Sequence, residues 1–481
     1  MSSVARADLR FVLASPVRSA VVLGDLAPWT EALAFAGVQV DDRARRPDVA
    51  VAPVGLARSA LATGAPTIVL EGRAFHRLSR AGFAVRRYLP LPSIEAPGLI
   101  LPTGDAAPVR YALRRWRPAS TAAKRVRNRI AEAAISSRAL PPVRPLQAVG
   151  TRGPTAYPYF VAAATEVGVP SDVSWYLAPG HGDALTRGTF YLFRPASREP
   201  DWVLKFARIP GYRKPFDRDE QGLRLAAAAG ETVVAHVPRL FGRLEVDGVH
   251  ASVETAASGE PLSALVRRSP GDARRKIDEI ADWVVRVGVD TASPADALRA
   301  ERERLTDEIL PQWTRSGADP AWVDRLAPVP GVLQHNDLGT WNLVVDAAGF
   351  TAIDWEWARE HGFPLWDLLY FLVDALPQLD GARTDTERVQ AALKLVRGES
   401  RSSGLLFSWL GRAVSDIGIP AAAVGTLATL CFLHHGRSHL SRARELSSAG
   451  ATRSRVPPIE QIAPLWLADP ALGPTWSAWR R

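Results

Sequence analysis

Three polar side chains between residues 331 and 358 have the types and the spacing that phosphoryl transfer needs. Asp337, Asn342 and Asp354 each adjoin a short apolar run that predicts a β-strand, so we expect the three side chains to converge at strand ends. One carboxylate could take the proton of an attacking hydroxyl, and the other, with the amide oxygen, could hold Mg²⁺, because a hard cation prefers oxygen ligands. For any one of these residues, simple turn capping is the alternative role.

The elements that must position these side chains are three short strands, predicted at 332–333, 343–345 and 350–353. The last two strands are joined by a turn at 346–349, which predicts a hairpin. Helical patterns dominate from residue 262 onward. Helices are expected at 274–289, 364–376, 386–397, 405–416 and 420–443.

The same stretch resembles the aminoglycoside phosphotransferase and choline-kinase family, whose fold is similar to that of protein kinases. The string HNDLGTWN, which contains Asp337 and Asn342, resembles the catalytic loop of the family, and IDWE, which contains Asp354, resembles its metal-binding segment. The resemblance implies that Asp337 is the catalytic base and that Asn342 and Asp354 bind Mg²⁺. In the string PLWDLL, it also implies that Asp367 supports the catalytic loop from behind.

A β-rich lobe is expected before the catalytic stretch, at residues 148–255. Lys205 points away from the apolar residues that flank it in a predicted strand. By the resemblance, Lys205 holds the ATP phosphates and Glu220, on the following helix, is its ion-pair partner, although a solvated Lys and a surface Glu are the ordinary alternative. Gly180 and Gly182 lie in a hairpin that, by the same resemblance, covers the phosphates with backbone N–H groups.

Residues 1–118 alternate strand-like and helix-like segments, which predicts a Rossmann-like α/β domain. This part weakly resembles a class I methyltransferase, but only Gly24 follows the first strand, where a nucleotide-binding turn has several glycines. We therefore expect a non-catalytic, degenerate domain used for recognition or scaffolding. The predicted fold is this α/β domain, a basic linker at 119–147, and an α+β bilobal kinase-like domain with an N-lobe at 148–255 and a helical C-lobe at 256–481.

The formal net charge of +9 is concentrated in the first half of the 481-residue chain. Residues 255–481 carry 25 Lys and Arg against 28 Asp and Glu, so residues 1–254 supply +12. Basic residues at 110–129 could meet an anionic partner or a membrane surface, and a solvated linker helix is the alternative. Aromatic residues are sparse in this strip, and no specific nucleic-acid motif is present.

The single cysteine excludes an intramolecular disulfide, and no signal peptide or membrane-spanning run is recognisable, so a cytoplasmic location is expected. The sequence predicts an ATP- and Mg²⁺-dependent phosphotransferase that acts on a hydroxyl of a sugar, an aminoglycoside or an amino alcohol. A nucleotide-binding scaffold or pseudokinase with a partner-binding N-terminal domain is the alternative, and a bifunctional enzyme with methyl transfer at the front is a third. The complete set Lys205, Asp337, Asn342 and Asp354 argues against the scaffold.

Overall fold

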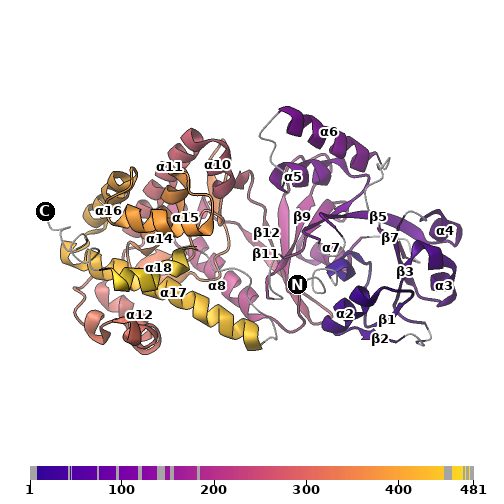
Figure 1. The fold of residues 1–481 in the computed structure, drawn as a ribbon, viewed down its shortest axis with the longest axis horizontal. Coiled ribbons are helices and arrows are strands. Elements are labelled where there is room, and N and C mark those ends of the chain that lie inside the picture. The colour runs from indigo at the N-terminus through magenta and orange to yellow at the C-terminus, as the bar shows by residue number, and fades with distance from the viewer. Residues whose placement is uncertain are drawn as a thin grey trace. The chain divides into compact units, whose positions relative to one another are not determined.

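The computed structural model describes residues 8–41, 44, 46–72, 75–93, 97–116, 122–137, 147–151, 157–180, 185–448, 458–469, 472 and 476. The chain forms two compact units, Met1–Arg213 with Leu240–Ala256 and Lys214–Arg239 with Ala257–Arg481 (Figure 1). Within the described residues, no helix has the length and hydropathy that a membrane span requires.

One sheet runs through the first unit and contains twelve of the described strands (Figure 1). Their order is β11-β12-β10-β9-β8-β6-β5-β7-β4-β3-β1-β2. The strands are β1 Ser19–Val22, β2 Gln39–Val40, β3 Val49–Pro53, β4 Thr67–Glu71, β5 Ala84–Leu91, β6 Leu99–Pro102, β7 Gln147–Thr151, β8 Ser174–Ala178, β9 Gly188–Phe193, β10 Trp202–Phe206, β11 Leu240–Val246 and β12 Val249–Thr255. The helices are α2 Ala27–Phe35, α3 Ala57–Ala62, α4 Phe75–Arg80, α5 Ala106–Trp116, α6 Ala122–Ser136 and α7 Tyr159–Ala163.

The α/β elements expected near the N-terminus are present, but the parallel sheet of a Rossmann-like domain is not confirmed. Strands β2, β1, β3 and β4 pair in parallel. Beyond β4 the pairing becomes antiparallel, through β7, β5 and β6. A short connection joins β5 to β6, and a parallel pair would need a crossover of a dozen or more residues, so this part of the sheet could not stay parallel.

The N-terminal elements and the expected N-lobe share this sheet instead of forming separate compact bodies. Strand β6 pairs with β8 through Ile100 and Leu177. The core beside this junction combines side chains from both segments, among them the buried Leu101, Tyr111 and Phe193. The predicted boundaries at 118 and 148 therefore do not coincide with a division between compact units, because this apolar core joins the two segments.

The second unit is mainly helical, as expected for the C-lobe (Figure 1). Its small strands are β13 Glu260–Pro261, β15 Leu343–Val345 and β16 Phe350–Ala352 in one sheet, and β14 Val332–Gln334 and β17 Arg359–Gly362 in another. Its helices are α8 Lys214–Ala228, α9 Glu231–Val234, α10 Leu262–Arg268, α11 Pro270–Asp290, α12 Arg299–Arg304, α13 Leu310–Trp313, α14 Trp366–Leu379, α15 Asp385–Val396, α16 Ser403–Ile417, α17 Val424–Ser448 and α18 Pro458–Ala468. The strands and helices predicted around the catalytic stretch are confirmed.

Helix α14 is the centre of this unit and carries residues that reach the catalytic stretch. It is apolar on nearly all sides, and twelve of its fourteen residues are buried. A helix of this kind must be covered all round. Helices α10, α11, α15 and α17 pack against it. Polar side chains on α14 are therefore enclosed by protein, and their partners are fixed by the fold.

Candidate active site

The loop from β14 to β15 carries two of the three predicted site residues and is anchored at both ends by strand pairing. Strand β14 pairs with β17, and β15 pairs with β16. At Asn336 the backbone has a φ of 65°, in the left-handed region that Asn adopts more readily than most residues. The loop therefore turns sharply one residue before Asp337.

Asp367, near the start of α14, holds this turn, as the resemblance implied. Its Oδ2 accepts a hydrogen bond of 2.6 Å from the N–H of His335, and its Oδ1 accepts one of 2.7 Å from the N–H of Asn336. Burial raises the pKa of Asp367 to about 6, and the two N–H donors oppose that rise. The strained turn is thus fixed by two bonds to one carboxylate.

Both carboxylate oxygens of Asp337 accept hydrogen bonds. The hydroxyl of Tyr370 donates to Oδ1 at 2.9 Å, and the amide of Asn342 donates to Oδ2 at 2.9 Å. The same amide group donates to the backbone oxygen of Asp337 at 2.9 Å. Asp337 is only partly buried, so a substrate hydroxyl can reach it. Tyr370 was not predicted, although its place three residues after Asp367 on one helix face was a usable signal.

Asn342 and Asp354 lie at the same end of the β15–β16 hairpin. The register pairs Leu343 with Ala352, and the N–H of Ile353 donates to the backbone oxygen of Asn342 at 2.9 Å. The amide nitrogen of Asn342 donates its hydrogen bonds to Asp337, which leaves the side-chain oxygen of Asn342 available as a ligand. That oxygen accepts no hydrogen bond from the described residues. An amide oxygen and a carboxylate so placed are ligands suited to Mg²⁺.

His335 connects the two loops as a neutral ring. Its Nδ1 accepts a 3.3 Å bond from the N–H of Asp337, so Nε2 carries the proton and donates to the backbone oxygen of Ile353 at 3.0 Å. Burial lowers the pKa of His335 to about 4, which keeps the ring uncharged near neutral pH. The ring also lies 4.7 Å from that of buried Trp355.

Helix α8 packs closely against the segment that carries Asp354. A Cβ added to Gly222 would lie 2.0 Å from the carbonyl oxygen of Trp355. Asp354 itself has a φ of 70°, again in the left-handed region. The absence of a side chain at Gly222 therefore permits the approach of α8 to this strained segment.

A second buried carboxylate on α14 fixes the middle of the catalytic loop. Asp374 accepts bonds from the N–H and the hydroxyl of Thr340, at 2.9 and 2.6 Å through Oδ2. Gln378 donates to the Thr340 hydroxyl at 3.0 Å. On the opposite side, the N–H of Ser263, on α10, donates to the Thr340 carbonyl at 3.3 Å. This contact was not predicted from the sequence, because Thr340 precedes Asp374 by 34 positions and no local pattern connects the two residues.

In the first unit, Lys205 is buried and forms an ion pair of 2.6 Å with Glu254, which is buried as well. Strands β10 and β12 bring the two together, since Lys205 lies opposite Ser252 and Val203 lies opposite Glu254. Glu220 belongs to the second unit, where it accepts a bond of 2.6 Å from Arg224 one turn away. Its pairing with Lys205 stays a prediction, whereas the Glu254 partner was missed.

In the hairpin predicted to cover the phosphates, the backbone at Gly180 lies close to the facing segment of the hairpin. A Cβ on Gly180 would lie 2.7 Å from the carbonyl oxygen of Arg187. Only glycine permits this close approach of the two chain segments. Gly182 lies outside the described residues, so its expected role stays a prediction.

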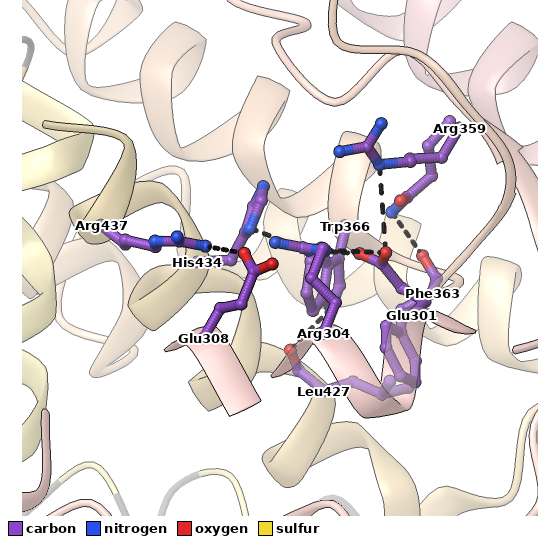
Figure 2. Close-up of polar contacts among 10 residues, drawn as sticks. Glu301, Arg304, Glu308, Arg359, Phe363, Trp366, Leu427, His434 and Arg437 are labelled. Carbon is purple, nitrogen blue, oxygen red and sulfur yellow. Dashed lines mark hydrogen bonds and ion pairs between the residues drawn. The ribbon is translucent and has the colours of Figure 1, made fainter. Parts of the chain in front are cut away.

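A network of ion pairs connects β17 with α12, the π-helical turn Leu305–Ile309 and α17 (Figure 2). Arg304 pairs with Glu301 and donates to Nδ1 of His434 at 3.2 Å. Arg359 lies 3.9 Å from Glu301, and Arg437 pairs with Glu308 at 2.8 Å. Each of these three arginines therefore forms an ion pair with a carboxylate.

The basic strip at 110–129 is partly used within the first unit. Arg110 pairs with Glu132 at 2.6 Å, and Arg114 pairs with Glu199 at 2.5 Å. Arg115 donates to the hydroxyl of Tyr111 at 3.2 Å. These contacts reduce the charge that this strip offers, and no finding supports the expected anionic or membrane partner.

Residues 182–405 match the family model of the phosphotransferase enzyme family, APH. No curated protein sequence matches the chain. Among solved structures, the chain is similar to a thermostable mutant of aminoglycoside phosphotransferase APH(4)-Ia with ADP and hygromycin B, at 14% identity over 65% of this chain and 96% of that one, with a TM-score of 0.38. Glucosamine kinase in complex with glucosamine, ADP and inorganic phosphate aligns at 16% identity over 65% and 84%, with a TM-score of 0.35. WbdD aligns at 13% identity over 87% and 89%, with a TM-score of 0.27.

Proposed function

Because residues 182–405 match the model of the phosphotransferase enzyme family, we propose that this chain is an ATP- and Mg²⁺-dependent kinase that phosphorylates a hydroxyl group of a small molecule. The family match confirms the resemblance found in the sequence and the enzyme class, a small-molecule phosphotransferase. The acceptor belongs to the sugars, aminoglycosides or amino alcohols in this proposal.

The observation that carries the proposal is the environment of Asp337. Its carboxylate is held from both sides by Tyr370 and Asn342 and remains partly exposed. A carboxylate fixed in this way can orient a substrate hydroxyl and accept its proton as the oxygen attacks phosphorus. Since phosphoryl transfer depends mainly on positioning and charge, a rigid base on a strained loop suits the reaction.

The residues fit Mg²⁺, which we propose is held by the side-chain oxygen of Asn342 and the carboxylate of Asp354. Bound Mg²⁺ would neutralise charge on the phosphates. Among the described residues no group of three or more His, Cys, Asp or Glu side chains could hold a metal ion. A sparse oxygen set is consistent with Mg²⁺, which keeps several water and phosphate ligands.

For the nucleotide, we propose that Lys205 contacts the phosphates and that the loop with Gly180 and Gly182 covers them. The buried Glu254 supports this role, because it holds the Lys205 ammonium at 2.6 Å. A buried cation that is held in place on strand β10 can bind an anion. We propose no catalytic role for the α/β elements of residues 1–118. Their role in recognition or scaffolding stays a prediction.

The proposal is tested with thermal-shift titrations of ATP, with and without Mg²⁺, on the wild type, Asp354→Ala and Asp337→Asn. Binding to the folded state alone raises stability by about 2.7 kcal/mol at a hundredfold excess over Kd. We expect a Mg²⁺-dependent shift in the wild type and in Asp337→Asn, and its loss in Asp354→Ala.

A phosphotransfer assay on a panel of hydroxyl compounds completes the test. Asp337→Asn should lower kcat by about 10²- to 10⁴-fold, the usual contribution of a positioned base, while still binding nucleotide. Full activity in Asp337→Asn would contradict the assignment of the base. Absence of any ATP shift in the wild type would contradict the nucleotide site, whereas a shift without phosphate transfer to any compound of the panel would favour the nucleotide-binding scaffold alternative.

A further inference from the structure

Trp341 lies inside the catalytic loop, between Asp337 and Asn342, and is only partly buried. Its indole ring packs so closely on Gly339 that a Cβ added to this glycine would overlap the ring. The centroid of the indole is 6.2 Å from that of the Tyr370 ring, at an interplanar angle of 80°. Because the Tyr370 hydroxyl also binds Asp337, the indole and the base share a neighbour. The indole therefore borders the place where a substrate hydroxyl must meet Asp337.

The indole N–H of Trp341 is not used within the protein. It donates to none of the described residues, and it is not enclosed, so it reaches solvent. Two buried tryptophans of the same unit differ, since Trp355 donates to the Ala352 carbonyl at 2.9 Å and Trp366 to the Leu427 carbonyl at 3.0 Å. A buried indole N–H usually has such a partner. The N–H of Trp341 is thus a donor that a ligand can use.

The residues on either side of Trp341 are fixed by hydrogen bonds. Thr340 is fully buried and donates to the buried carboxylate of Asp374 through its N–H and its hydroxyl. The N–H of Asn342 donates to the Gly339 carbonyl at 3.0 Å. A buried carboxylate lowers stability unless it is well paired, and a simple turn does not need one. These bonds limit the positions that the Trp341 side chain can take before a substrate binds.

A single exposed ring with one donor suits a neutral sugar better than a cation. A sugar has C–H groups on its faces and hydroxyls at its edge, so an aromatic ring can cover one face while polar groups bind the edge. Organic ammonium groups are bound in cages of several aromatic rings. Among the described residues, the one ring that contacts Trp341 is Tyr370, which is only 3% exposed and packs on His435 at 4.1 Å. The described residues therefore form no cage around the position next to Trp341.

We propose that Trp341 is the surface on which the phosphate acceptor lies, and that the acceptor is a neutral sugar whose C–H face covers the indole. This inference rests on the proposed function, because it selects among the acceptors that Asp337 could activate. A hydroxyl at the edge of the sugar meets the Asp337 carboxylate, and another oxygen of the sugar accepts from the Trp341 N–H. Trp341 thus determines which acceptors bind, while Asp337 accepts the proton.

The test measures acceptor binding by calorimetry and saturation-transfer NMR on the full chain, saturated with Mg²⁺ and ADP. The neutral probes are the methyl glycosides of glucose, galactose, mannose and N-acetylglucosamine, and the cationic probes are glucosamine, choline and kanamycin. We expect at least one neutral glycoside to bind about tenfold more tightly than every cationic probe. Trp341→Ala should weaken its binding by about tenfold, and Trp341→Phe, which keeps an aromatic face, should weaken it less.

A measurement on the wild type makes the test independent of how the variants fold. Saturation of the aromatic protons should transfer mainly to the C–H protons on one face of the bound glycoside, because that face covers the indole. Equal transfer to both faces would contradict the stacked arrangement. Trp341→Ala should also keep the Mg²⁺-dependent ATP shift, which a general disturbance of the catalytic loop would remove.

The matched control is Trp409→Ala. Trp409 is also partly exposed and lies on α16 of the same unit, where its N–H donates to Asp278 at 3.0 Å. This variant should bind the glycoside as tightly as the wild type does. Unchanged glycoside binding in Trp341→Ala would overturn the inference, as would tighter binding of a cationic probe or the absence of binding by every neutral glycoside.

The outcome is separable from that of the proposed function. A Mg²⁺-dependent ATP shift without glycoside binding would leave the kinase assignment intact and overturn the role of Trp341. Glycoside binding that depends on Trp341, without an ATP shift, would support this role and contradict the kinase assignment.

Discussion

The hydroxyl of Tyr370 donates a hydrogen bond of 2.9 Å to Oδ1 of Asp337, the oxygen that Asn342 does not use. Tyr370 comes from the buried helix α14, and its ring lies 4.1 Å from that of His435. Neither neighbour is close to it in sequence. The base is therefore oriented by the core of the second unit as well as by its own loop.

Tyr370→Phe should lower kcat about tenfold with little change in KM, because it removes one hydrogen bond worth about 1 to 1.5 kcal/mol from the base. The phenyl ring keeps the packing against His435, so the free energy of unfolding should fall by no more than the lost hydrogen bond contributes, about 1 to 1.5 kcal/mol. Steady-state kinetics and chemical denaturation check both expectations. A variant with unchanged kcat would mean that the Asn342 bond alone orients Asp337.

Asp367 and His335 should make opposite contributions to stability as pH changes. The pKa of Asp367 is raised to about 6 from 3.8, so between these values the folded state binds more protons and its stability falls as pH rises. The pKa of His335 is lowered to about 4 from 6.5, so over that range the folded state binds fewer protons and stability rises with pH. The two slopes partly cancel between pH 4 and 6.

Asp367→Asn removes the contribution to stability that falls as pH rises and leaves the His335 contribution, which increases with pH. The free energy of unfolding of the wild type minus that of the variant should therefore decrease from pH 4 to pH 6, with a slope approaching about 1.4 kcal/mol per pH unit. Urea denaturation at several pH values measures it. A difference that does not vary with pH would mean that Asp367 stays ionised throughout this range.

Gly222→Ala should destabilise the protein, although alanine normally favours a helix over glycine by about 1 kcal/mol. The added Cβ would meet the carbonyl oxygen of Trp355 at 2.0 Å and push α8 away from the segment that carries Asp354. We expect a loss of about 1 to 3 kcal/mol and a weaker Mg²⁺-dependent ATP shift. Gly271, on α11, is the control, because nothing lies within 4 Å of its Cβ position, and Gly271→Ala should leave stability equal or higher.

The parts of this site that follow from the sequence are local. Asp337, Asn342, Asp354 and Asp367 lie in short strings whose spacing is set by strands, turns and one helix start. In the structure Asp367 binds the loop as expected, and Asn342 and Asp354 share one hairpin end. Short-range geometry was sufficient for these residues.

The parts that the sequence could not supply depend on contacts between distant segments. The Thr340 bond to Asp374 depends on how α14 packs under the loop. The pairing of β6 with β8 depends on an apolar core formed by residues from both sides of the basic linker. No local sequence pattern predicts this pairing. Lys205 shows the same limit: the resemblance places its ion-pair partner, Glu220, on the next helix, whereas the register of β10 and β12 supplies Glu254 from a neighbouring strand.

The partner of Lys205 can be decided by comparing Glu254→Gln with Glu220→Gln. In Glu254→Gln the buried ammonium loses its carboxylate, and loss of one member of a buried pair costs about 3 to 5 kcal/mol. Glu220 is paired with the exposed Arg224, so its replacement should change the free energy of unfolding by less than about 1 kcal/mol. Denaturation of the two variants in parallel gives the first comparison.

The KM for ATP gives the second comparison. Glu254→Gln should raise KM at least tenfold, because the Lys205 ammonium is no longer held in place to meet the phosphates, and Glu220→Gln should raise it less. The opposite order would restore the partner implied by the resemblance to the phosphotransferase family. It would also mean that the 2.6 Å pair with Glu254 is replaced when nucleotide binds, so the free and bound states would then differ in the carboxylate that positions Lys205.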